Sequence, residues 1–478
     1  MAEKEKLDPA LRRTAIVVIV GALAVVFDTT IVSIALRTLA TELNTTVDVI
    51  QWVTTGYLLA LGVAIPLVGW AQSRIGGKRL WIAALSLFLV ASVLCSLAWD
   101  PQSLIAFRVL QGLGGGALLP LSSTLVIQAA QGRNLGQVMA TMSLPTVLGP
   151  ILGPVLGGLI LNTLDWRWLF WVNVPFCVVG LILAALLLPK NEPARPVRLD
   201  IVGLLLLSPS IVGLLFGLSN VAKDGGFGRA DVFLPLIFGA ALLTGFIAWA
   251  IQHSGTALVD VHLLTYRPLA TSSALLFLTG VSLYGAMLLL PLYWQEVRGF
   301  DPLGAGLLLI SQGLGTFLSR SSAGRLTDRF GARWVSVAGF AIVGLGTLPF
   351  AVATASTNEW ILMAALLVRG FGLGAVTIPL MAVGFVGLER AEVPHASIIT
   401  RIATQVGGSF GVAVLAVILH AQVVGGVDLA TAFDQAFWWA VGFTGLGVAL
   451  SFLLPARQGR TPASAPATAP AVPAREPA

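Results

Sequence analysis

The stretch Gly149-Pro150-Ile151-Leu152-Gly153-Pro154-Val155-Leu156-Gly157-Gly158 places four glycines and two prolines inside an apolar segment, 138–162. In a helix exposed to water these residues are costly, at about 1 kcal/mol per glycine and about 3 kcal/mol per proline relative to alanine. In a membrane bundle they are tolerated, because neighbouring helices satisfy the freed backbone groups and small residues allow close contact. With about 1.5 Å of rise per residue, the segment is long enough to cross a bilayer. The stretch therefore predicts a membrane-spanning helix pressed against a partner helix.

The composition of the whole chain indicates the same environment. Of its 478 residues, 56% are hydrophobic and 10% are charged, whereas a soluble domain carries about 25% charged residues. Apolar runs of about 19 residues or more, long enough to span a membrane as helices, number fourteen. The predicted spans are 14–36, 51–72, 80–98, 104–127, 138–162, 168–188, 200–219, 232–252, 270–294, 304–322, 334–353, 360–386, 396–420 and 434–454.

The connections between these spans are short and leave no room for a soluble catalytic domain. No catalytic cluster is found within the spans, and no Gly-x-x-x-x-Gly-Lys-Ser/Thr nucleotide-binding motif is present. The two cysteines, Cys95 and Cys177, both fall inside spans and are expected to be ordinary core residues. The sequence therefore predicts neither an enzyme nor a bound cofactor or metal ion.

Positive charge is distributed unevenly over the predicted loops. Counted from an N-terminus inside the cell, nineteen Lys and Arg residues fall on the inner side and five on the outer side. Lys and Arg accumulate in cytoplasmic loops, so we expect the terminal segments 1–13 and 455–478 to be cytoplasmic. The second of these is rich in Ala and Pro and is expected to be disordered. The formal charge of +6 follows from this topology, and no basic face with aromatic residues suggests nucleic-acid binding.

Two short motifs occur twice, at nearly the same offset. The loop after the second span has a counterpart after the tenth span, 255 residues later. Arg108 in the fourth span has a counterpart, Arg369, 261 residues later in the twelfth span. Parallel repeats are a known transporter architecture, and an offset of eight spans leaves two extra helices between two sets of six. We therefore predict two six-helix bundles, 14–188 and 270–454, separated by two inserted helices in 200–252.

With these repeats, the sequence resembles the fourteen-helix drug:proton antiporter branch of the major facilitator superfamily. The motifs that carry the resemblance are Asp28-Thr29-Thr30-Ile31-Val32, Gln51-Trp52, Arg108 with Gln111-Gly112, the stretch 149–158, Trp166-Arg167-Trp168 with Asn173-Val174-Pro175, and Gln405 with Gly407-Gly408-Ser409. The resemblance implies an all-α integral membrane protein of the major facilitator fold, with two pseudo-symmetric six-helix bundles plus two inserted central helices. In this family the stretch 149–158 is similar to the antiporter motif of exporters, represented here by Gly149, Pro150, Gly153, Pro154, Gly157 and Gly158.

Asp28 is the outstanding carboxylate within the predicted spans. An ionised carboxylate at the centre of a bilayer costs roughly 2.5–3.5 kcal/mol on insertion scales, so we expect it to face water or a partner. Arg108 lies at a similar depth, counted at about 1.5 Å per residue from the outer end of its helix, and is the expected partner. The resemblance implies that this arginine influences protonation on the first helix. Asp28 and Arg108 are the predicted proton-coupling and substrate residues; the alternative is that each only bonds neighbouring helices.

Other polar and aromatic residues are weaker candidates. Glu296, at the outer end of the ninth span, is either a water-exposed rim residue or a site of proton entry or cation release. Aromatic residues near helix ends are more often interface anchors than ligands of a substrate. With that alternative, the candidates for lining a substrate cavity are Gln51, Trp52, Tyr57, Gln111, Tyr284, Arg369 and Gln405.

The two repeated loops are expected to gate the transporter. They contain Gly69, Arg74, Gly76, Lys78 and Arg79 in the first copy, and Gly324, Asp328, Arg329, Gly331 and Arg333 in the second. In the resembling family, an acid at the fifth position pairs with nearby basic residues and stabilises the outward-open state, a pattern that Asp328 and Arg329 fit. The first copy has Ser73 at that position, so its charge relay is in doubt. The alternative is that the basic residues only enforce topology.

The predicted function is proton-driven efflux of amphipathic, cationic drugs or toxic compounds by alternating access. The protein is expected to act as a monomer in the cytoplasmic membrane, in contact with lipid, with protons and a small molecule as its partners. An exporter dedicated to one antibiotic or metabolite fits the sequence equally well. The glycine-rich motif disfavours a nutrient uptake symporter, and Asp28 with the paired loops disfavours a receptor that transports nothing.

Overall fold

The computed structural model of the protein describes residues 9–45, 47–130, 144–189, 198–221, 228–253, 255–354, 356–389 and 391–455. Within these ranges every regular element is a helix, which confirms the all-α fold that the apolar spans and the family resemblance predict. The first part of the fifth predicted span, 138–143, and the tail 456–478 lie outside the described residues.

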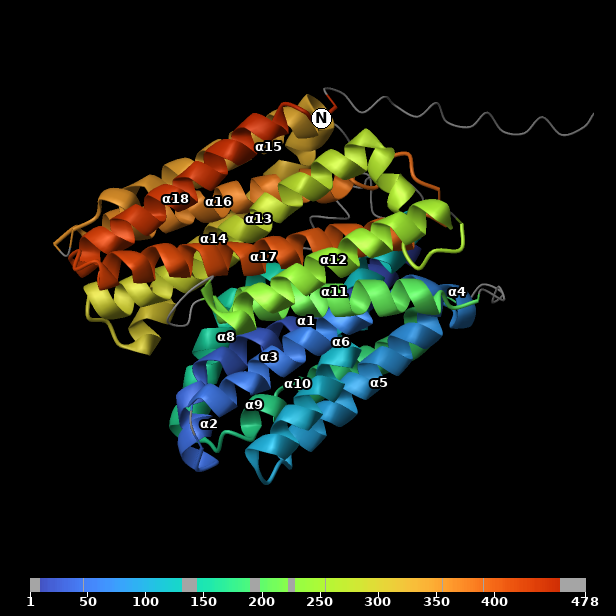
Figure 1. The fold of residues 1–478 in the computed structure, drawn as a ribbon, viewed down its shortest axis with the longest axis horizontal. Helices are drawn as coiled ribbons and strands as arrows, with labels where there is room; N and C mark the ends of the chain where they lie inside the picture. Colours follow the sequence, from blue (N-terminus) through green and yellow to red (C-terminus); the bar gives the residue numbers. More distant parts are fainter. Residues whose placement is uncertain are drawn as a thin grey trace, which may run out of the picture.

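The helices that precede the inserted pair form what we term the N-terminal group, drawn in blue to green-cyan in Figure 1. Its members are α1 (Pro9–Ile34), α2 (Leu36–Glu42), α3 (Val47–Ala64), α4 (Leu67–Ile75), α5 (Gly77–Ser96), α6 (Pro101–Ala130), α8 (Leu144–Thr163), α9 (Trp168–Trp171) and α10 (Asn173–Leu187).

The inserted pair consists of α11 (Ile201–Asn220) and α12 (Ala230–Gln252), followed by the short helix η2 (Val261–Thr265). The helices that follow form the C-terminal group, drawn in yellow-green to red in Figure 1. Its members are α13 (Arg267–Leu292), η3 (Tyr293–Val297), α14 (Pro302–Phe330), α15 (Ala332–Thr347), η4 (Leu348–Val352), α16 (Glu359–Val383), α17 (Val393–Val424) and α18 (Leu429–Ser451).

The described part of each of the fourteen predicted spans overlaps one helix or consecutive helices. In the described part of the chain, ten helices are long and apolar enough to cross a membrane, and a bent pair is an eleventh candidate. This pair, Trp52–Ala64 and Leu67–Ile75, meets at an angle of 55°. The sequence predicts a single span over 51–72, and the structure corrects it to two helices. The cause is Pro66, which has no N–H to donate and whose ring clashes with the preceding turn.

The glycine-rich stretch of α8 packs against α1. A side chain on Gly149 would meet Val26, and a side chain on Gly153 would overlap the hydroxyl of Thr30. The same hydroxyl donates a hydrogen bond to the carbonyl of Gly149 at 3.2 Å. Because small residues let helix backbones approach closely in a membrane, the predicted partner helix is α1, which carries Asp28.

The two repeated loops have the same backbone conformation. Gly76, between α4 and α5, has φ 85° and ψ 155°, and Gly331, between α14 and α15, has φ 83° and ψ 156°. A positive φ of this size suits glycine and strains other residues. Each glycine N–H donates to the carbonyl four residues earlier, to Gln72 at 2.8 Å and to Thr327 at 2.9 Å. The local geometry therefore agrees with duplication of this segment.

The two groups meet at one end of the molecule, termed the base, where α1 begins, α6 ends and α17 begins. There Thr124 of α6 donates a hydrogen bond to Ser397 of α17 at 3.1 Å, and Gly69 of α4 faces Pro394 and Ile398 of α17. One apolar cluster contains base residues of both groups. At the opposite end, one described cluster belongs to the C-terminal group and another to the N-terminal group. The groups are therefore joined at the base, and α8 and α14 also contact each other, whereas the two described clusters at the other end each belong to one group.

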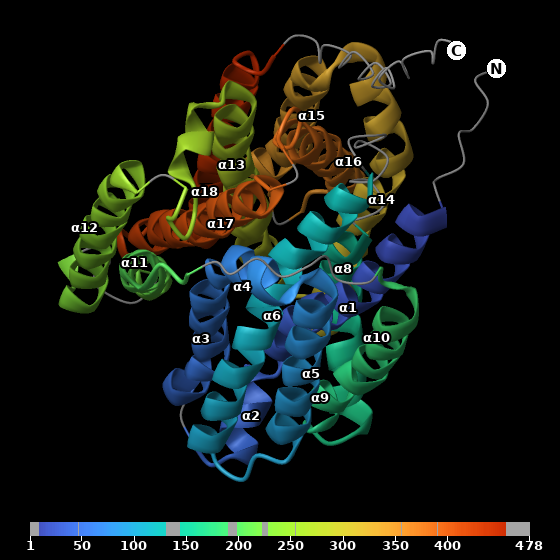
Figure 2. The same cartoon turned by 90° about the vertical axis from the view of Figure 1, so that its right-hand side faces the viewer.

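The inserted helices lie on one flank of the molecule, where α11 contacts both α3 and α17 (Figure 2). Asp200 ties the two inserted helices together. Its carboxylate accepts hydrogen bonds from Gly203 N–H in α11 at 2.8 Å, from Trp249 Nε1 in α12 at 3.1 Å, and from Leu258 N–H beyond α12 at 3.0 Å. The inserted pair is thus a hairpin that touches both helix groups.

Replacing Gly153 by alanine is expected to destabilise the folded protein, because the new methyl group overlaps Thr30. Overpacking of this kind costs about 1–3 kcal/mol. The matched control is Gly445→Ala on α18, where no described atom lies within 4 Å of the new methyl group. Thermal unfolding in detergent should give a lower midpoint for Gly153→Ala than for the wild type, and an unchanged or higher midpoint for Gly445→Ala. Equal midpoints for all three proteins would contradict the close contact of α1 with α8.

Candidate functional site

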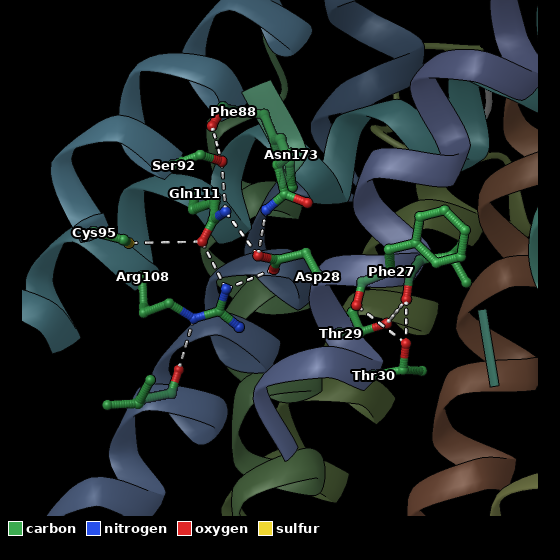
Figure 3. A network of polar contacts seen from close by, with 12 residues as sticks. Phe27, Asp28, Thr29, Thr30, Phe88, Ser92, Cys95, Arg108, Gln111 and Asn173 are labelled. Carbon is green, nitrogen blue, oxygen red and sulfur yellow. Dashed lines mark hydrogen bonds and ion pairs between the residues drawn. The ribbon is translucent and has the colours of Figure 1, made fainter. Parts of the chain in front are cut away.

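Asp28 has no exposed surface and lies inside the N-terminal group. Its helix, α1, is apolar on all sides over most of its length, and such helices are buried on all sides. Arg108 of α6 reaches this acid: its Nη1 lies 2.5 Å from Asp28 Oδ2, and neither side chain is more than 1% exposed (Figure 3). The two helices therefore meet in a buried ion pair. Its two residues are those that the sequence predicts to lie at similar depths along their helices.

Three further polar side chains complete the network in Figure 3. Gln111 Nε2 of α6 and Asn173 Nδ2 of α10 each donate a hydrogen bond to Asp28 Oδ1 at 2.9 Å. Gln111 Nε2 also donates to Ser92 Oγ of α5 at 2.7 Å, and Ser92 donates to the carbonyl of Phe88 at 2.8 Å. Four helices, α1, α5, α6 and α10, are thus connected through this network.

Arg108 is fixed from several sides. Its Nε donates to the carbonyl of Val53 in α3 at 3.1 Å, and its Nη1 also donates to Gln111 Oε1 at 2.6 Å. The guanidinium lies 4.1 Å from the centre of the Tyr57 ring, in cation–π geometry. Gly112 brings α6 this close to α3, since a side chain there would overlap the carbonyl of Tyr57. The arginine therefore cannot move without loss of contacts to two helices.

This network compensates the charge of Asp28. Moving an ion from water into a protein interior costs several kcal/mol, and a partner ion offsets that cost only when the remaining hydrogen-bonding sites are also filled. Asp28 Oδ1 accepts two hydrogen bonds and Oδ2 accepts one from the arginine. One guanidinium and two amide groups thus meet the charge of this carboxylate.

The C-terminal group contains the counterpart of this arginine without an acid. Arg369 of α16 is 2% exposed. It donates to Gln312 Oε1 of α14 at 2.7 Å, to the carbonyl of Ser282 in α13 at 2.7 Å, and to Thr347 Oγ1 of α15 at 3.2 Å. No carboxylate among the described residues pairs with it. Its partners are neutral, so the two helix groups differ in their buried charge.

Three of the predicted cavity residues are buried in this structure. Tyr57 and Gln111 are fully buried within the N-terminal group, and Arg369 is buried within the C-terminal group. Their polarity suggests contact with water in the sequence, but in the folded chain they serve the buried guanidinium groups instead. Tyr284 on α13 and Gln405 on α17 are partly exposed, as lining residues would be.

Trp52 lies elsewhere, in a groove of about 850 Å³ between α3, α11 and α12. Its side chain is 44% exposed, and its ring lies 5.7 Å from that of Phe216 in α11. Apolar side chains form most of the groove, and no residue of the Asp28 network lines it. This groove suits an apolar molecule and is separate from the ion pair.

Glu296 is not brought near Asp28. It lies in the π-helical segment η3, at the end of α13 away from the base, and its side chain is exposed. This position agrees with the rim residue that the sequence allows. The predictions for three other side chains fall outside the described part of the chain, namely those of Gln51, Pro150 and Pro154.

Ser73 and Lys78 of the first repeated loop both donate hydrogen bonds to backbone carbonyls. Ser73 Oγ donates to the carbonyl of Gly69 within its own helix at 3.0 Å, so it does not replace the missing acid. Lys78 Nζ donates to the carbonyls of Ala185 and Leu188 at the end of α10, at 2.7 and 3.1 Å. This lysine therefore interacts with helix-end carbonyls, which carry partial negative charge.

In the second loop, the family resemblance implies a charge pair at Asp328. Asp328 and Arg329 are both exposed, and Asp328 forms no ion pair with any residue that the structure describes. The guanidinium of Arg329 lies 5.2 Å from the ring of Phe330 instead. Arg333 donates to the carbonyl of Leu454 at 2.6 Å, which attaches this loop to the end of α18.

The sequence places Asn173 in one of the motifs that carry the family resemblance but assigns it no role, and it does not single out Ser92. Both side chains are neutral, so only the tertiary structure shows that they belong to the network of Asp28. Asn173 does stand out in one respect, because it is the polar first residue of an otherwise apolar helix, α10.

Substituting Arg108 by glutamine is expected to destabilise the protein, because Asp28 would remain as an unpaired buried charge. Removing one partner of a buried pair costs about 3–5 kcal/mol. The double variant with Asp28→Asn leaves two neutral amides, so it should be more stable than Arg108→Gln alone. Thermal unfolding of the wild type, both single variants and the double variant measures this coupling. Additive effects of the two substitutions would show that the pair is not coupled.

Comparison with known proteins defines the family. The family model of the Major Facilitator Superfamily matches residues 18–411 and 272–477. The multidrug resistance protein B homolog of Mycobacterium tuberculosis (strain H37Rv) is 37% identical over 430 residues, which cover 90% of this chain and 80% of that protein. Lincomycin resistance protein LmrB of Bacillus subtilis (strain 168) is 28% identical over 399 residues, with 83% and 82% covered.

A solved structure shares the fold. The crystal structure of the human organic anion transporter MFSD10 matches with a TM-score of 0.65, over 93% of this chain and 100% of that chain. Its sequence identity is 18%, so this match establishes the fold alone. From the family model, the relatives and the helical fold, this chain belongs to the major facilitator superfamily, whose members are multi-pass membrane transporters of small molecules and not enzymes.

Proposed function

We propose that this protein exports amphipathic small molecules and that the inward flow of protons drives the export. The observation that carries the proposal is the fully buried ion pair of Asp28 and Arg108. Ionisable groups within membrane spans are costly and mark ion or substrate pathways. The relatives' names refer to multidrug resistance and lincomycin resistance, which supports drugs as the substrate class.

Proton binding would change the net charge of the pair from zero to +1, because Arg108 keeps its charge when Asp28 is neutralised. In the structure, Arg108 neutralises the ionised Asp28. A proton on Asp28 removes the negative charge that Arg108 faces, while the arginine keeps its contacts with Gln111, Val53 and Tyr57. The attraction between α1 and α6 weakens at that point, so protonation favours a different arrangement of these helices. Each proton that enters releases about 2.3 kcal/mol per 100 mV of membrane potential.

Alternating access would supply the movement of the substrate. In transporters built from repeats, the two helix groups rock against each other around a site between them. In this structure the groups are joined at the base, where Thr124 contacts Ser397, and their clusters at the other end are separate. On the orientation predicted from the positive charges, the base is cytoplasmic and the structure is outward-facing. We infer that it represents the stage at which substrate leaves and a proton enters.

A cationic substrate is consistent with this exchange. Protonation of Asp28 removes its attraction for a cation, so proton uptake and substrate release would occur on the same side of the membrane. Asp28 is fully buried in this structure, and we therefore assign its contact with a cation to the inward-facing stage. The substrate would enter from the cytoplasm or the inner leaflet.

Export of a single antibiotic is the second candidate. The name of the Bacillus subtilis relative refers to resistance to one compound, lincomycin. A panel of structurally unrelated drugs separates the two candidates: a multidrug exporter responds to many members of the panel, whereas a dedicated exporter responds to one chemical class.

Substitution of Asp28 by asparagine is expected to abolish proton-coupled export, because an amide does not take up and release a proton as a carboxylate does. The measurement uses inside-out membrane vesicles that are acidic within, and follows the proton gradient by fluorescence. Addition of a substrate should dissipate the gradient with the wild type and not with Asp28→Asn.

The control for this experiment is Asp165→Asn. Asp165 is 49% exposed and pairs with Arg167 at the surface, and exposed pairs of this kind contribute only about 0–1 kcal/mol. The control variant should dissipate the gradient as the wild type does. Retained proton-coupled export by Asp28→Asn would exclude Asp28 as the essential proton site.

A covalent bond across the base is expected to stop export, because alternating access requires the base to open. Thr124→Cys combined with Ser397→Cys replaces two hydroxyl groups whose oxygens are 3.1 Å apart. Oxidation with copper phenanthroline should abolish export of the substrate by the double variant, and a reductant should restore this export. The single variants are the controls, since each introduces one cysteine without the partner needed for a bond across the base. Unchanged export by fully cross-linked protein would argue against opening at the base.

A further inference from the structure

The network around Asp28 presents only donors to the carboxylate. Arg108, Gln111 and Asn173 each direct an N–H group at one of its oxygens. An ionised carboxylate only accepts hydrogen bonds, whereas a carboxylic acid also has one O–H to donate. A protonated Asp28 therefore needs an acceptor, which one of these three neighbours has to provide.

Arg108 and Gln111 are not able to provide it. Arginine has no acceptor atom. Gln111 Oε1 already accepts from Arg108 at 2.6 Å and from the thiol of Cys95 at 3.7 Å, while its Nε2 donates to Ser92 at 2.7 Å. Reversing this amide would turn its NH₂ group toward the guanidinium and break these bonds. The orientation of Gln111 is therefore fixed by its other partners.

Asn173 differs because one end of its amide is unused. The side chain is fully buried, its Nδ2 donates to Asp28, and its Oδ1 has no hydrogen-bond partner among the described residues. Buried polar atoms are nearly always paired, so such an oxygen calls for an explanation. The terminal torsion of asparagine is broad and roughly two-fold, and a half-turn would break no described bond except the one to Asp28.

We propose that Asn173 is the positioning residue for the proton of Asp28. Its amide donates to the ionised carboxylate and, after a half-turn about its terminal torsion, its carbonyl accepts from the carboxylic acid. The step balances: a proton adds to Asp28 Oδ1 and forms one O–H bond, and an N–H···O hydrogen bond is replaced by an O–H···O hydrogen bond. This inference rests on the proposed function, which assigns the transported proton to Asp28.

Protonation of Asp28 would therefore affect the contact of α1 with α10 and the contact of α1 with α6 differently. The contact of α1 with α10 through Asn173 persists in both protonation states, since the amide serves each of them. The contact of α1 with α6 loses its ionic character when Asp28 is protonated, because Arg108 then faces a neutral oxygen. Protonation would therefore loosen α1 from α6 selectively while α1 and α10 stay connected.

Infrared difference spectroscopy between low and high pH tests this role on the purified full-length protein. The wild type should show a carboxylic acid C=O band that is absent in Asp28→Asn. It should also show a change in a side-chain amide C=O band, which moves when asparagine is labelled with ¹³C. In Asn173→Leu the acid band should shift to higher frequency, because its O–H has no acceptor, and the amide change should disappear. Asn220→Leu, at a buried asparagine on α11, is the matched control and should leave both signals intact.

The outcomes separate the two proposals. If no acid band depends on Asp28, the proposed proton site fails. If that band is present but keeps its frequency in Asn173→Leu, the role of Asn173 is overturned and Asp28 remains the proton site. Should Asn173→Leu not fold, the labelled wild type decides. A label-sensitive amide change that is lost in Asp28→Asn supports the role, and its absence overturns it.

Discussion

An ionised carboxylate that is shielded from water has to be surrounded by hydrogen-bond donors, and this requirement organises the N-terminal helices. Asp28 of α1 receives one donor from Arg108 and one from Gln111, both of α6, and a third from Asn173 of α10. Ser92 of α5 supports the amide of Gln111 from behind. Because an uncompensated ion would cost several kcal/mol, the correct packing of these helices and the chemistry of the site depend on the same contacts.

Such short contacts require helices that approach closely. Gly112 allows α6 to reach the backbone of α3 at Tyr57, whose ring in turn covers the guanidinium of Arg108. Gly153 of α8 allows an equally close approach to α1 at Thr30. In lipid, helices associate through packing and hydrogen bonds, without a hydrophobic driving force between them. The glycine-rich stretch and the buried acid are separate motifs in the sequence, but in the fold they belong to one assembly around α1.

The sequence predicts those features that depend on length, hydropathy and charge. The positions of the spans follow from apolar runs, and the pairing of Asp28 with Arg108 follows from their similar depths and opposite charges. Other features depend on tertiary contacts of neutral side chains, which neither charge nor spacing in the sequence reveals. Asn173 is one neutral amide among many polar residues, and its role becomes visible only beside Asp28. Tyr57 suggests a cavity or interface position until Arg108 is found over its ring.

The duplicated arginines explain why one helix group would carry the proton chemistry. Arg108 and Arg369 are both buried and both bind a glutamine and a backbone carbonyl of a neighbouring helix. Only Arg108 also has a carboxylate, since Arg369 is held by Gln312, Ser282 and Thr347 alone within the described chain. An arginine does not release its proton in proteins, so Arg369 keeps one charge state throughout a cycle. Within these two networks, only the N-terminal group holds a carboxylate whose charge a proton can cancel, so under the proposed function the proton chemistry would belong to that group.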